Sequence, residues 1–100
     1  MLRVFISGMI TGTNDYLERF SRAEEELHKR GYEPVNPASV TAQLPKTLTH
    51  EEYMTVTLAI LTICDAIYMR GGWGDSEGAK RELRAAKMLR MKVMQKGDLK

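Results

Sequence analysis

Four short apolar runs punctuate the sequence, and longer amphipathic segments separate them. The runs are rich in β-branched and aromatic residues and end at glycine, proline or polar residues, which is typical of strands. They cover residues 2–6, 32–37, 65–69 and 91–94. Pro34 cannot donate a hydrogen bond to a neighbouring strand, so the second run is expected near an edge of the sheet.

Three of the separating segments predict helices, over about 14–30, 49–63 and 76–90. In the first, the apolar residues recur at helical spacing and should face the sheet; they are Tyr16, Phe20, Ala23 and Leu27. Thr13 or Asn14 can cap its first turn. Thr49 with Glu52 three residues later forms the capping-box pattern of the second helix.

Residues 38–48 are expected to be a loop, because Pro37 and Pro45 interrupt the pattern there. The alternation of strands and helices with short connections predicts an α/β fold. We expect a small doubly wound, flavodoxin-like or Rossmann-like domain with a parallel four-stranded sheet in the order 2-1-3-4 and helices on both faces. A single domain should span 1–96, followed by a short tail, 97–100.

Composition adds little that is specific. The chain is 43% hydrophobic and 28% charged, which is typical of a globular protein. The net charge is only +2, and the basic residues between 80 and 96 fit a solvated helix face, so no nucleic-acid polymer is expected as a partner.

No apolar run approaches the roughly 20 residues of a membrane span, and the sequence enters a strand pattern at once. We therefore expect no membrane partner and a cytoplasmic location. Cys64 is the only cysteine, so no disulfide can form within the chain, and its apolar surroundings predict a buried, inert thiol.

Two glycine-containing loops follow the first and third strands, "SGMITGT" and "RGGWGDSEG". If those strands are neighbours, both loops line one crevice at the carboxyl ends of the sheet. Their glycines let backbone N–H groups approach a ligand, and the helix starts behind them favour an anion. Neither loop has the spacing of a P-loop or a dinucleotide fingerprint, so ordinary turns remain the alternative.

Glu82 is the most informative candidate. The third helix has an apolar face made by Ala79, Leu83, Ala86 and Leu89. Glu82 projects into the middle of that face, about two turns from the end that points at the crevice. A structural salt bridge is one explanation; the other is a carboxyl group with a tuned pKa that serves as nucleophile or acid-base group.

Other candidates are less decisive. Trp73 could stack on a base or sugar, or anchor packing or a dimer. Tyr53 and Tyr68 could line the same cleft or an interface. His28 and His50 lack metal-ligand spacing with Cys64, and no Ser-His-Asp pattern is visible.

Several motifs in order carry a resemblance to a known family. They are "VFISGMITG", "RAEEELHKRGYEPVNP", "CDAIYM" and "GWGDSEGAKRE". The chain resembles, to about residue 94, the nucleoside 2-deoxyribosyltransferase-like superfamily, and most of all its short branch from phage and bacterial genomes. The most specific elements are the first-strand motif and the Ser, Gly and Glu of "SEGAKRE".

The resemblance implies cleavage or exchange of the N-glycosidic bond of a 2′-deoxynucleoside or its 5′-monophosphate. Glu82 matches the glutamate that attacks the anomeric carbon. Ser76 and Gly78 match the loop that holds the sugar or phosphate. The loop that surrounds the ligand is matched by Ser7, Gly8 and Gly12. The resemblance implies no metal or cofactor, a small-molecule nucleoside or nucleotide as partner, and a homodimer or higher homo-oligomer.

One departure from the family pattern concerns catalysis. Relatives carry an aspartate eight residues before the aspartate that matches Asp65, and this chain has Thr57 there. Asp75 could supply part of the missing role, and Met9 stands where the short branch often has proline. Two alternatives stay open: a binding module that holds a nucleotide-derived ligand without reaction, and a structural dimer. The sequence does not fix the base, the phosphate state, or hydrolysis against transfer.

Overall fold

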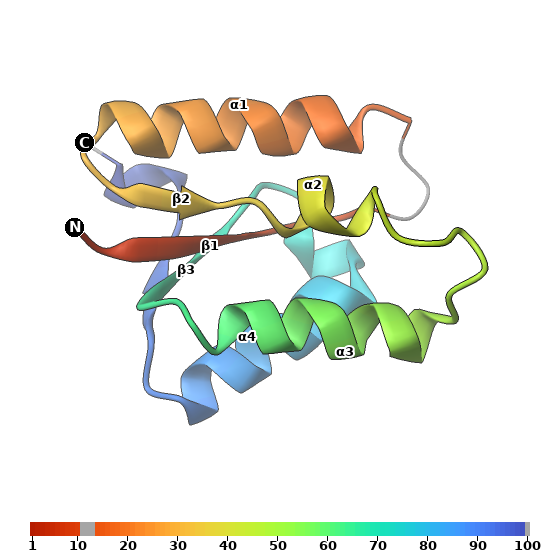
Figure 1. The fold of residues 1–100 in the computed structure, drawn as a ribbon. Coiled ribbons are helices and arrows are strands. Elements are labelled where there is room, and N and C mark those ends of the chain that lie inside the picture. Colours follow the sequence, from red (N-terminus) through yellow and green to blue (C-terminus); the bar gives the residue numbers. More distant parts are fainter. Residues whose placement is uncertain (11–13, 100) are drawn as a thin grey trace.

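The computed structural model describes residues 1–10 and 14–99 and contains one parallel sheet between layers of helices (Figure 1). The strands are β1 (Arg3–Ser7), β2 (Glu33–Val35), β3 (Ala66–Met69) and β4 (Lys92–Met94). The α-helices are α1 (Tyr16–Lys29), α2 (Pro37–Thr41), α3 (His50–Leu61) and α4 (Glu77–Met88). The strand order is β2-β1-β3-β4 with all pairs parallel, which confirms the predicted α/β fold, its order and the edge position of the Pro34 strand.

Alternation along the strands divides the core into two layers. Val4 and Ile6 of β1 face α1, while Phe5 faces α3 and α4. Phe5 is in register with Val35 of β2 and Ile67 of β3, so the second layer runs across the sheet. The helices therefore cover both faces, as predicted.

The first layer of the core confirms the predicted inner face of α1. Phe20, Ala23 and Leu27 are buried, and Tyr16 packs against them. Asp15 occupies the cap position without a side-chain cap bond, so the proposed Asn14 cap is wrong. Thr13 lies outside the described residues.

Three further differences from the sequence prediction have local causes. The expected loop at 38–48 begins with α2, because Asn36 accepts a hydrogen bond from the Ser39 N–H at 3.2 Å and Pro37 suits the first helical turn. Leu89 is exposed rather than on the buried face of α4, because the helix has ended by that position. The expected tail contains a 3₁₀ helix, Lys96–Asp98, and Leu99 packs into the α1 layer.

The start of α3 forms as predicted. Thr49 accepts from the Glu52 N–H at 3.1 Å, and the Glu52 carboxylate accepts from the Thr49 N–H at 2.9 Å. This capping box fixes where α3 begins, beside the carboxyl ends of the strands. The β-branched later part of the segment remains helical to Leu61 because Met54, Thr57 and Leu61 are buried against the sheet and α4.

Candidate active site

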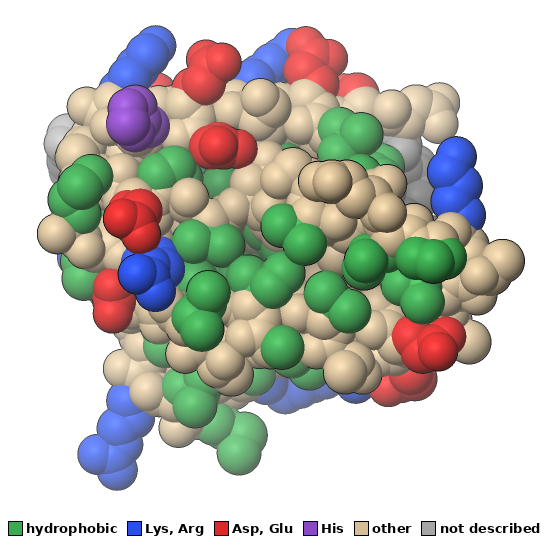
Figure 2. Space-filling model, in the orientation of Figure 1, with side chains coloured by type: hydrophobic (Ala, Val, Ile, Leu, Met, Phe, Trp, Pro, Cys, Tyr) green, Lys and Arg blue, Asp and Glu red, His purple; other side chains and the backbone are tan. Residues whose placement is uncertain are grey.

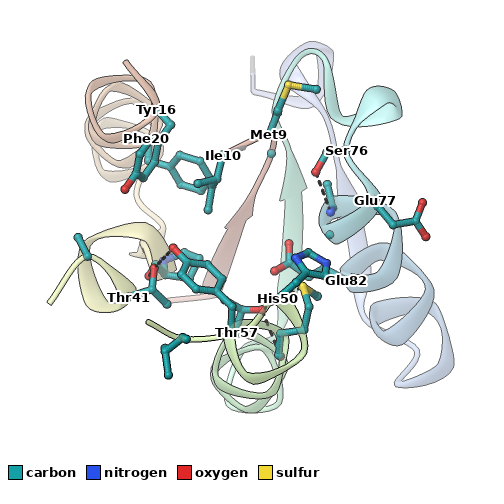
Figure 3. Close-up of a pocket in the computed structure, with 18 of the residues that line it drawn as sticks. Met9, Ile10, Tyr16, Phe20, Thr41, His50, Thr57, Ser76, Glu77 and Glu82 are labelled. Atoms are coloured by element: carbon teal, nitrogen blue, oxygen red, sulfur yellow. Dashed lines mark hydrogen bonds between the residues drawn. The ribbon is translucent and has the colours of Figure 1, made fainter. Parts of the chain in front are cut away.

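A cavity of about 930 Å³ opens at the carboxyl ends of β1 and β3, where the sequence predicted a crevice (Figure 3). The loop after β1 contributes Gly8, Met9 and Ile10, and the start of α4 contributes Ser76 and Gly78. Figure 3 shows Ile10 and the α1 side chains on one side of the cavity and α4 on the other. The two predicted loops therefore meet at one hollow.

Glu82 lies in this cavity, on α4, and is only 7% exposed. Its Oε1 accepts a hydrogen bond of 2.7 Å from the hydroxyl of Ser7, the last residue of β1. Among the described residues, no basic side chain forms an ion pair with Glu82, so the salt-bridge explanation is not the one realised there. The carboxyl group is held by a neutral donor at the carboxyl end of a central strand.

Two opposing effects set the acidity of Glu82. Burial raises the pKa of its carboxyl group above the ordinary value, because the charged form loses solvation. The hydroxyl groups of Ser7 and Thr57 act in the opposite direction and favour the carboxylate. Burial is the larger effect, so a proton is held more tightly on Glu82 than on an exposed glutamate.

Thr57, eight residues before Asp65, is part of the cavity wall. It is 2% exposed, lies on α3, and its hydroxyl donates to the Met54 carbonyl at 3.3 Å. Thr57 and Glu82 both line the cavity, and the Thr57 hydroxyl acts to lower the pKa of the Glu82 carboxyl group. A threonine here supplies a neutral hydroxyl beside the carboxyl group and cannot supply a second carboxylate.

The start of α4 is fixed by capping and close packing. The Ser76 hydroxyl accepts from the Ala79 N–H at 3.1 Å, which caps the helix. A Cβ on Gly78 would lie 3.3 Å from the sulfur of Met54, so this glycine lets α4 approach α3. Both residues line the cavity, and both also have a structural reason to be where they are.

The remaining predicted site residues are Asp75, Trp73 and Gly12. Asp75 lines the cavity and is exposed. Trp73 does not line it; its side chain is partly buried and packs against the core layer of Phe5 and Ile67. Gly12 lies outside the described residues.

The far wall of the cavity was not predicted. It comes from α1 and from the segment between α2 and α3, and it is largely apolar, with side chains that include Tyr16, Leu17, Phe20, Leu44 and Leu48. Tyr53 of α3 joins this helix to α2, because its hydroxyl lies 2.6 Å from that of Thr41. The helical spacing of Tyr16 and Phe20 signalled burial against the sheet but not that their edges border a hollow.

Other titratable candidates do not add a metal or thiol site. Tyr68 belongs to the buried core and does not line the cavity, whereas His50 lines it and is exposed. Burial raises the pKa of the Cys64 thiol to about 11, as expected of an inert cysteine. In the part of the chain that the structure describes, no cluster of His, Cys, Asp or Glu could hold a metal ion. Among those same residues, no helix is both long and apolar enough to cross a membrane.

The fold defines the class of protein. The solved structure of a 2-deoxyribosyltransferase from the psychrotolerant bacterium Bacillus psychrosaccharolyticus matches it with a TM-score of 0.70. The match covers 93% of this chain and 70% of that chain at 19% identity. The chain is thus an α/β protein with the fold of a nucleoside deoxyribosyltransferase.

The sequence profile of one family matches residues 2–95. The chain belongs to that family, which is described as a domain of unknown function, DUF4406. No curated protein matches the sequence significantly.

Proposed function

We propose that this chain cleaves or exchanges the N-glycosidic bond of a 2′-deoxynucleoside or its 5′-monophosphate, with Glu82 as the nucleophile. In this proposal it is a short member of the nucleoside 2-deoxyribosyltransferase-like superfamily, of the branch found in phages and bacteria. The observation that carries the proposal is the buried carboxyl group of Glu82, which faces a ligand-sized cavity and has a hydroxyl donor but no cationic partner among the described residues.

The first chemical step follows from that geometry. A carboxylate oxygen of Glu82 attacks C1′ of the sugar while the C1′–N bond breaks, and the bonding electrons leave with the base. The transition state carries positive charge on the sugar, which a neighbouring carboxylate stabilises. The product is a deoxyribosyl ester on Glu82 and a base that takes up one proton.

The second step regenerates the enzyme. Water, or the nitrogen of a second base, attacks C1′ and breaks the ester bond, so that Glu82 leaves as a carboxylate. With water the net reaction is hydrolysis, and with a base it is transfer. The apolar wall beside Tyr16 and Phe20 offers a surface on which a flat base could rest.

The departing base needs a proton, and Asp75 is our candidate source. It is a carboxyl group on the cavity wall, and its exposure lets it exchange protons with solvent. Thr57 can donate a hydrogen bond to Glu82 or to a ligand but cannot act as a net acid at neutral pH. We therefore propose a slower reaction than in relatives that carry an aspartate there.

We also propose that the protein works as a homodimer in the cytoplasm. The sequence of α3 and its end contains no charged residue from 53 to 64, although residues such as Ala59 and Ile63 face solvent. Figure 2 shows hydrophobic side chains gathered over α2 and α3 on this face. An uncharged face with exposed apolar side chains suits a contact between two copies.

The test is release of free base from deoxynucleosides and from their 5′-monophosphates by the purified chain. We expect release by the wild type and loss of it in Glu82→Ala and Glu82→Gln. Glu25→Gln, an exposed carboxylate of α1 outside the cavity, serves as the matched control and should retain activity.

Acid quenching should trap a deoxyribosyl adduct on wild-type protein, and peptide mass spectrometry should place it on Glu82. If no substrate releases base, the enzyme proposal fails. A rise in melting temperature with nucleotides under that outcome would instead indicate a binding module.

A further inference from the structure

Arg70 is a buried cation without an anionic partner among the described residues. It follows β3 directly, is 9% exposed, and takes part in none of the ion pairs formed in the described part of the chain. Its Nε is buried and has no hydrogen-bond partner among those residues. Arginine is rarely buried unless its charge is paired, so this position needs an explanation.

The guanidinium group lies directly behind one wall of the cavity. Its Nη2 donates to the Met9 carbonyl at 3.1 Å, and its Cζ lies 4.4 Å from the centre of the Phe20 ring. Met9, Phe20 and Gly8 all line the cavity, whereas Arg70 does not line it itself. The cation is therefore one layer beneath the surface that a ligand would touch.

Gly8 is what allows the guanidinium group to sit there. A Cβ at this position would come within 2.7 Å of both Nε and Nη2 of Arg70. The Nε atom is buried and the guanidinium group is stacked on the Phe20 ring, so the group cannot move aside without losing its contacts with Met9 and Phe20. The glycine of the first-strand motif thus has a second use besides approach to a ligand.

Charged groups near Arg70 do little to balance its positive charge. Burial is the main cause that lowers the pKa of Arg70, and Arg19 acts in the same direction, while Tyr68 and Asp15 oppose them. Asp15 is already paired with Arg19 at 2.9 Å on the exposed side of α1. Because arginine stays charged in proteins, an unbalanced positive charge remains behind the wall of Gly8 and Met9.

The opposite wall of the cavity carries negative charge. Asp75, Glu77 and Glu82 line the α4 side, and Glu77 points away from the hollow in Figure 3. Lys46 also lines the cavity, but its side chain is exposed, so solvent weakens its attraction for an anion. A dianion that avoids the α4 side is therefore drawn most strongly to the side backed by the buried Arg70. The resemblance places a phosphate at Ser76 and Gly78 instead, so the charge distribution makes a different assignment.

We propose that the wall formed by Gly8, Met9 and Ile10, backed by the guanidinium group of Arg70, is a subsite for a phosphate monoester, and that the substrate is therefore a 2′-deoxynucleoside 5′-monophosphate. The choice of substrate rests on the proposed function; the phosphate subsite does not. In a low-dielectric site the charge of Arg70 acts through the wall, and the bound phosphate supplies the anion that the fold lacks.

The experiment compares binding of a deoxynucleoside and its 5′-monophosphate by calorimetry, with inorganic phosphate as a further ligand. Potassium chloride at the same ionic strength controls for screening. We expect the wild type to bind the monophosphate about 10-fold more tightly than the nucleoside, because the buried charge attracts the phosphate through the wall without a direct hydrogen bond.

Arg70→Met should abolish this preference while nucleoside binding stays within about twofold, and Arg70→Lys should keep part of it. Arg22→Met, which removes an exposed cation of α1, is the control with the same change in net charge and should keep the preference. Gly8→Ala gives a second test that leaves Arg70 in the chain, because the added methyl group must displace the guanidinium group.

A merely structural role for Arg70 makes a different prediction. Removing it would then lower the melting temperature and weaken both ligands alike. Equal affinity of the wild type for nucleoside and monophosphate, or an unchanged preference in folded Arg70→Met, would overturn the proposal. Because these readouts are binding constants, they stand even if no base is released, so failure of the proposed reaction and failure of the subsite are distinguishable.

Discussion

The hydroxyl of Ser7 donates to Oε1 of Glu82 at 2.7 Å and so joins the end of β1 to α4 across 75 residues of sequence. This bond is one of two contacts that favour the ionised form of Glu82 against its burial. The carboxyl group must be ionised to act as a nucleophile, so the bond bears directly on the rate.

Ser7→Ala should shift the pH dependence of base release. Without the donor, the pKa of Glu82 rises further, and the acidic limb of kcat/KM should move to higher pH, with a lower rate at neutral pH. A pH profile from 5 to 9 measures this in steps of about half a unit. Ser21→Ala, an exposed change on α1, is the control, and an unshifted limb in Ser7→Ala would contradict the prediction.

Glu82→Gln should change how stability depends on pH. The folded pKa of Glu82 is raised above 4.5, so its contribution to stability is complete below that pH and is lost as pH rises through the folded value. Relative to the wild type, Glu82→Gln should therefore become more stable at neutral pH by about 1.4 kcal/mol for each unit of upward shift.

Urea unfolding of both proteins at pH 4 and pH 8 measures the effect on stability. Glu25→Gln, whose side chain is exposed, should show no such change. A constant difference between Glu82→Gln and wild type across this range would mean that the carboxyl group is not held in a protonating environment.

Thr57→Asp should restore the carboxyl group that the family resemblance implies. We expect faster base release, by on the order of tenfold or more, because a general acid beside the ligand can protonate the leaving base. We also expect a lower melting temperature, because position 57 is 2% exposed and a second acid there is costly. Thr57→Val keeps the shape of the side chain and lacks the hydroxyl, so it separates the effect of packing from that of the hydroxyl. If Thr57→Asp does not release base faster than the wild type, a general acid at position 57 has no role in this protein.

The outer face of α3 should control self-association. Ile63, two residues beyond α3, is 59% exposed, and Ala59 of α3 is also exposed. We expect the wild type to elute as a dimer and Ile63→Glu to shift toward monomer, as measured by size-exclusion chromatography with light scattering. Met88→Glu changes another exposed apolar residue, on α4, and should leave the mass unchanged; a wild-type monomer at all concentrations would refute the prediction.

Much of the fold could be predicted because it depends on local pattern. The apolar run that contains Val4, Phe5 and Ile6 and the capping box at Thr49 are both visible in the sequence. The pair Asn36-Pro37, a helix cap followed by a proline, also indicates the start of α2. The prediction of a loop at 38–48 treats the prolines only as helix breakers and so misses this helix.

The candidate site was predictable in its outline and not in its partners. The spacing of α4 indicated that Glu82 points inward, because that depends on helix periodicity alone. That Ser7 meets it, that Trp73 packs away from the cavity, and that Arg70 lies behind Gly8 depend on how distant segments dock. No local property of a sequence encodes such contacts.

Leu99 joins the residues that follow β4 to the core. Its side chain is buried in the same layer as Val4 and Met94, and the 3₁₀ helix Lys96–Asp98 leads the chain from β4 to that position. One layer of the core is thus completed by side chains from the first strand and from beyond the fourth.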